Sequence, residues 1–76
     1  MCKKAFIIFS TGEDRKRAER KLLAAALHVE SESIVNGARI SGYERIVDSG
    51  SGFCFHLHHG GTITIEKQAI ESVREY

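Results

Sequence analysis

The chain has 76 residues, a formal net charge of +1 and no proline, and this length is that of one domain. Two cysteines are too few for a secreted fold held by disulfides, and no stretch approaches the roughly 20 apolar residues of a membrane span. A hydrophobic content of 42% with 28% charged residues is typical of a folded protein, not a disordered one. We therefore expect a cytoplasmic domain without a membrane partner, with Cys2 and Cys54 reduced. A bridge between these two thiols is the alternative.

Residues 4–9 form a continuous apolar run, which predicts a strand covered on both faces. The residues that follow this run have the pattern of a helix N-terminus, a hydroxyl side chain with an acidic residue three positions later. Thr11 with Asp14, or Ser10 with Glu13, resembles a capping box, in which a hydroxyl and an acid satisfy free N–H groups of the first turn. We expect a helix to begin here.

Strong helix formers continue to about His28. Apolar residues recur along this segment at spacings of four, three and four, which defines one buried stripe. The stripe consists of Ala18, Leu22, Ala25 and Val29.

The middle of the chain predicts a hairpin. Residues 29–35 alternate loosely and precede Asn36-Gly37, a pair that favours a type I′ turn because both residues tolerate a positive φ. A returning strand follows at 38–40 and continues through 43–47. Apolar residues in this second half also have helical spacing, so a short helix is the alternative for 38–47. Residues 48–52, Asp-Ser-Gly-Ser-Gly, predict a turn or loop.

Residues 53–65 predict two strands joined at Gly60-Gly61. In the first of them the side chains alternate between two faces. Phe53, Phe55 and Leu57 share one face, and Cys54, His56 and His58 share the other.

From about Thr64 the apolar period changes from two to that of a helix. Ala69, Ile70, Val73 and Tyr76 suit a short amphipathic helix, with Thr64 as its N-cap and Glu66 in its first turn.

These elements predict an α+β fold in the order β-α-β-β-β-β-α, or one strand fewer. We expect a single two-layer domain over residues 1–76, with a mainly antiparallel sheet and two helices on one face. The first β-α-β step could be a crossover connection that leaves two strands parallel, which would give the fold a ferredoxin-like character.

Cys54, His56 and His58 are the residues most capable of site chemistry. At i, i+2 and i+4 on one strand face, neighbours lie about 7 Å apart at ~3.3 Å per residue, so two of them can share a metal. Zn, Ni or Cu would suit such ligands. The competing interpretation is a polar outer face with Cys54 as a small apolar filler, and on that interpretation no cofactor is bound.

The charge is unevenly distributed along the chain. Residues 1–28 carry seven Lys/Arg and three Asp/Glu, and residues 29–76 carry four and seven. The excess of positive charge gathers on the predicted first helix, at Lys16, Arg17, Arg20 and Lys21. Such a strip can attract an acidic protein surface or the phosphates of a nucleic acid.

We predict that the protein is not an enzyme, because nothing in the chain marks an oxyanion hole and a domain this small has little room for a cleft. The leading hypothesis is a small binding or regulatory module that docks on a larger protein or on its own copy, comparable in size to bacterial regulators and phage-encoded inhibitors. Its contacts would come from the basic strip and from Tyr43. The alternatives are a metal-binding protein and a nucleic-acid-binding protein.

Overall fold

The computed structural model describes residues 3–32 and 34–76. Within these residues the chain forms seven strands, one α-helix and one turn of 3-10 helix. In chain order they are β1 (Lys4–Phe9), α1 (Gly12–Ala24), β2 (His28–Glu32), β3 (Gly37–Ser41), β4 (Tyr43–Asp48), β5 (Gly52–Leu57), β6 (Thr62–Glu66), η1 (Lys67–Ala69) and β7 (Ile70–Glu75).

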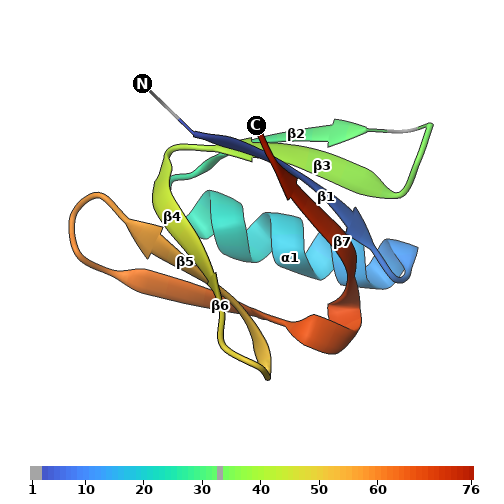
Figure 1. The fold of residues 1–76 in the computed structure, drawn as a ribbon. Coiled ribbons are helices and arrows are strands. Elements are labelled where there is room, and N and C mark those ends of the chain that lie inside the picture. Colours follow the sequence, from blue (N-terminus) through green and yellow to red (C-terminus); the bar gives the residue numbers. More distant parts are fainter. Residues whose placement is uncertain (1–2, 33) are drawn as a thin grey trace.

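The strands make two antiparallel sheets, one in the order β2-β3-β1-β7 and the other in the order β4-β5-β6. Figure 1 shows α1 running beneath the four-stranded sheet, with the three-stranded sheet beside it. The α+β class and the antiparallel pairing predicted from the sequence are therefore confirmed.

The first β-α-β step has the expected parallel relationship. β1 and β2 both pair with β3 in antiparallel fashion, so they run parallel to each other with β3 between them. Only this part of the fold has the ferredoxin-like character.

A hydrophobic core lies between the sheets and α1. Ala5, Ile7 and Phe9 of β1 point into it and are almost fully buried. Phe6 and Ile8 point to the other face of the sheet and are half-buried, so β1, an inner strand of its sheet, is covered completely on one face and only partly on the other. The remaining core residues are Ala18, Leu22, Leu27, Ala38, Ile40, Tyr43, Phe55, Leu57, Ile65 and Ile70.

The predicted second helix does not form. The structure has β6, the single turn η1 and then β7 in its place, so the prediction of two helices on one face of one sheet was wrong. The physical reason is long-range pairing. β7 supplies the second ladder partner of β1, with Ile7 opposite Val73 and Phe9 opposite Ile70, and this pairing overrides a weak local helical period.

The segment 38–47 is extended, which decides between the two alternatives left open by its sequence. It divides at Gly42, whose φ is +94°, into β3 and β4. Each half joins a different sheet, so one predicted strand becomes two.

The β2–β3 hairpin is present, but Asn36-Gly37 is not a two-residue turn. Glu32 pairs with Gly37 at the start of the ladder, which leaves four residues, 33–36, in the connection. Gly37 lies in β3, where an added Cβ would stand 2.7 Å from the carbonyl oxygen of Ile7. The position requires glycine because β1 approaches it closely, not because φ is positive. Asn36 donates to the carbonyl of Phe9.

α1 begins as predicted and ends earlier. Thr11 is the N-cap and accepts a hydrogen bond from the backbone N–H of Asp14. At the other end Ala26 has a φ of +66°, and Leu27 donates to the carbonyl of Leu22, which is the hydrogen bond of a Schellman motif. The chain reverses there, so Val29 belongs to β2 and not to the helix stripe.

Candidate docking groove

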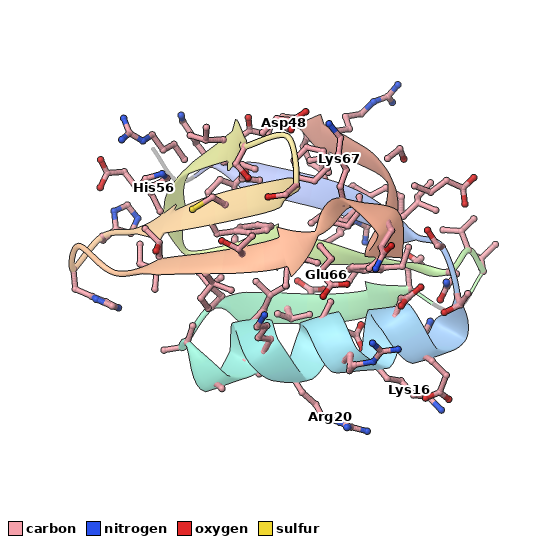
Figure 2. All side chains as sticks on the ribbon, turned by 90° about the horizontal axis from the view of Figure 1, so that it is seen from below. Lys16, Arg20, Asp48, His56, Glu66 and Lys67 are labelled. Carbon is pink, nitrogen blue, oxygen red and sulfur yellow. The ribbon has the colours of Figure 1, made fainter. Side chains whose placement is uncertain are left out.

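A groove of about 430 Å³ lies between α1 and the segment formed by β6 and η1. Figure 2 shows α1 beside the strand that leads to Glu66. We call this feature the α1–β6 groove. Its lining residues are Asp14, Arg17, Ala18, Arg20, Lys21, Ile65, Glu66 and Ala69.

The apolar part of the α1–β6 groove belongs to the edge of the core. Ala18 and Ile65 are buried, and Ala69 is half-buried and packs against the core to which they belong. Two of these three side chains are methyl groups, which leaves space above them. The groove therefore offers a small apolar surface at its base.

Basic side chains of α1 line one side. The ammonium of Lys21 donates to the backbone carbonyl oxygen of Thr64 at 2.9 Å, so it spans the groove. Arg17 lies 3.5 Å from the Asp14 carboxylate, and 71% of its side chain is exposed. Because most of the Arg17 side chain is in solvent and the contact is long, this pair contributes little to stability, and Arg17 remains available to another anion.

The two acidic residues of the groove already have partners. The Asp14 carboxylate accepts a hydrogen bond from the Thr11 hydroxyl in the cap of α1. The Glu66 carboxylate accepts a hydrogen bond from the side-chain amide of Gln68. They reduce the net positive charge of the groove.

The basic strip predicted from the sequence is present, but the structure divides it. Lys16, Arg17, Arg20 and Lys21 are all exposed on α1. Arg17, Arg20 and Lys21 line the α1–β6 groove, whereas Lys16 does not. Figure 2 shows Lys16 on the side of the helix that faces away from the sheets, with Arg20 extending in the same general direction from the rim.

The prediction that Tyr43 makes contacts at the surface was wrong. Its side chain is 1% exposed and packs edge-on against Phe55, with ring centroids 5.7 Å apart. It occupies the core because β4 turns into the second sheet directly after Gly42. Its hydroxyl donates to a Glu75 carboxylate oxygen at 3.0 Å, which links β4 to β7. Burial, together with this hydrogen bond, raises the pKa of Tyr43 above its usual value of 10.0.

The three candidate metal ligands are only partly brought together. Cys54 and His56 alternate with buried residues along β5 and share its outer face. His58 lies beyond the end of β5, in the turn to β6, and is exposed. Within residues 3–32 and 34–76, no group of three or more His, Cys, Asp or Glu side chains is placed to hold a metal ion. The metal site stays a prediction.

Cys54 is a free, half-buried thiol. The alternative of a bridge to Cys2 involves a residue outside the described part of the chain. No helix in that described part is long and apolar enough to cross a membrane.

The loop between β4 and β5 is a hairpin turn, as predicted. The Asp48 carboxylate accepts from the backbone N–H of Gly50 and from the ammonium of Lys67 at 2.9 Å. The hydrogen bonds from Lys67 and Gly50 lower the pKa of Asp48. This arrangement closes the turn on itself and ties it to η1.

A second hollow, of about 580 Å³, lies over β1, β2 and β3. Lys4 and Arg39 line it together with Glu30 and His28, so charges of both signs are mixed there. The α1–β6 groove differs in having an apolar base and basic side chains along one side, which makes it the better candidate for a docking site.

Sequence reasoning found the basic side of the groove and missed the other side. Glu66 and Ala69 were assigned to a second helix, whereas Ile65 was correctly placed in the strand that follows Gly60-Gly61. The period-two alternation of β6, Thr-Ile-Thr-Ile-Glu over residues 62–66, was the signal that an exposed strand continues there.

Comparison of the chain with models of known protein families finds no match, and searches of curated proteins and of solved structures find none. The function is therefore argued from the α1–β6 groove itself.

Proposed function

We propose that this protein is a non-enzymatic binding module that docks on an acidic segment of a partner protein through the α1–β6 groove. The observation that carries the proposal is that Arg17, Arg20 and Lys21 stand along one side of a groove with an apolar base. A protein segment with acidic and small apolar side chains complements both features.

A protein ligand has more support than a nucleic acid. Asp14 and Glu66 also line the groove, and they would repel a continuous phosphate backbone while leaving room for a single carboxylate beside Arg17 and Lys21. The sequence pI of 7.8 is also below the value of about 9 that is common in nucleic-acid-binding domains.

The test uses short random peptides displayed on phage and selected on the folded domain. We expect enrichment of sequences rich in Asp and Glu. A synthetic peptide of an enriched sequence is then measured against two charge reversals of equal size on the same helix. Lys21→Glu changes the groove, and Lys16→Glu changes the opposite side of α1.

We expect Lys21→Glu to weaken peptide binding by about tenfold or more, because a nearby attraction becomes a repulsion. Lys16→Glu should change it by about twofold at most, since exposed charges farther away are screened by salt. Selection without acidic enrichment contradicts the proposal, and so does equal loss in both variants. If the domain instead retards single-stranded nucleic acid at low salt and Lys21→Glu abolishes this, the ligand class is wrong.

A further inference from the structure

The hydrogen bonds at the two ends of the β5–β6 ladder fix which backbone groups of β6 are used within the sheet. Leu57 donates to the carbonyl of Gly61 at 2.9 Å, and Lys67 donates to the carbonyl of Ser51 at 3.1 Å. Between them the strands pair without a bulge. Hydrogen-bonded and non-hydrogen-bonded pairs alternate in an antiparallel ladder, so the pairs made by Ile63 and Ile65 are the bonded ones.

The other residues of β6 direct their backbone away from β5. Thr62, Thr64 and Glu66 occupy the non-bonded pairs, and β6 is the edge of its sheet. Among residues 3–32 and 34–76 no other strand pairs with this side of β6, so these N–H and C=O groups form an edge that an additional strand can pair with.

The side chain of Lys21 shows that a carbonyl on this edge of β6 can accept a hydrogen bond from outside the sheet. Its ammonium bonds the carbonyl oxygen of Thr64, where the backbone N–H of an added strand would lie. A long, exposed side chain can leave that position without disturbing the core. Once released, it stands beside the same groove and can pair with a carboxylate of the ligand.

The dimensions of the site suit an extended segment. β6 has five residues and is roughly 17 Å long at ~3.3 Å per residue. α1 has 13 residues and is roughly 20 Å long at 1.5 Å per residue. On the side of β6 the groove is lined by Ile65, Glu66 and Ala69, so it lies beside the C-terminal end of β6, and the edge of β6 continues from it past Thr64 to Thr62.

We infer that the acidic segment binds as an added β-strand on the free edge of β6, between that strand and α1. This inference rests on the proposed function. Its main-chain groups pair with Thr62 and Thr64 and displace the Lys21 ammonium. Alternate side chains face the groove, where acidic ones meet Arg17 and Lys21, and the others face solvent.

The decisive experiment measures an enriched peptide against the wild-type domain and Thr64→Pro. Proline removes the N–H that faces the free edge and leaves the ladder to β5 intact, a position at which edge strands tolerate it. We expect about tenfold weaker binding from the lost hydrogen bond and the ring that replaces it. Unchanged binding by a folded Thr64→Pro variant overturns the inference.

A second measurement uses only the wild-type domain and methylates the backbone nitrogens of the peptide one at a time. Strand addition predicts a period-two pattern, in which every second methyl group weakens binding by about tenfold and the others have little effect. A uniform pattern, or one with helical spacing, overturns the inference even if Thr64→Pro fails to fold.

The two proposals fail differently. Absence of acidic enrichment removes the proposed function and this inference with it. Enrichment with loss of binding in Lys21→Glu, but with no effect of Thr64→Pro or of alternate methylation, keeps the groove and rejects strand addition. A domain that dimerises through β6 in sedimentation, and binds no peptide, shows that a second copy is the occupant.

Discussion

Replacing Tyr43 with Phe removes one hydroxyl at the junction of the two sheets and keeps the aromatic ring against Phe55. Hydrogen bonds to charged groups contribute about 1.5–3 kcal/mol to stability. The acceptor, Glu75, is exposed and regains water when the hydroxyl is lost. We therefore expect Tyr43→Phe to lower the free energy of unfolding by about 1 kcal/mol near neutral pH.

The same variant should change the alkaline limb of the stability curve. Because the folded pKa of Tyr43 lies above its usual value of 10.0, the unfolded chain loses the phenol proton first. The stability that this group contributes is complete below about pH 10 and decreases as pH rises. Above that pH the free energy of unfolding decreases by at most about 1.4 kcal/mol per pH unit. The observed slope should be smaller, because the carboxylate that accepts the hydrogen bond is exposed to solvent.

The assay is urea unfolding followed by far-ultraviolet circular dichroism at several pH values from neutral to about pH 11. The difference in stability between the wild type and Tyr43→Phe should shrink above about pH 10, because only the wild type loses the contribution of this group. Tyr76→Phe is the matched control for the loss of a hydroxyl near neutral pH, since Tyr76 is 62% exposed. A wild type and Tyr43→Phe of equal stability at neutral pH, or a difference that stays constant to pH 11, would refute the reasoning.

Three further predictions concern single positions. Ala26→Gly should raise the free energy of unfolding by about 0.5–1 kcal/mol, because Ala26 has a φ of +66° that only glycine adopts without strain; lower stability in urea would contradict this. Gly52→Ala should lower the free energy of unfolding by about 2 kcal/mol or more, since an added Cβ would lie 2.5 Å from the carbonyl oxygen of Ile65. Gly12→Ala is its control, with open space around the new methyl group, and should be neutral or stabilising. Lys67→Met should raise the pKa of Asp48 towards its usual value, because the Lys67 ammonium is the largest cause of the depression; a carboxyl titration by NMR that is unchanged in the variant would show that the pair does not persist in solution.

Local signals in the sequence were sufficient for several elements. The apolar run of β1 and the Thr11–Asp14 cap of α1 each depend on residues that are close together in the chain, and both formed where they were predicted. The alternation of Phe53 and Phe55 with Cys54 likewise placed the two faces of β5 correctly. These features follow from side-chain spacing and from hydrogen bonds within one turn, so a single sequence contains the information.

Tertiary contacts decided the rest. The last residues became β7 because β1 needed a second partner, and Tyr43 entered the core because β4 crossed into another sheet. Gly37 was required by the approach of Ile7 from a strand 30 residues away. The α1–β6 groove itself joins Lys21 to Thr64 across 43 positions of the sequence. Each of these outcomes depends on which distant segment supplies the hydrogen bonds and the apolar cover. The sequence by itself determined the local elements and the basic side of α1. Only the packing of β6 beside that helix brought the basic side chains and the apolar base together in one groove.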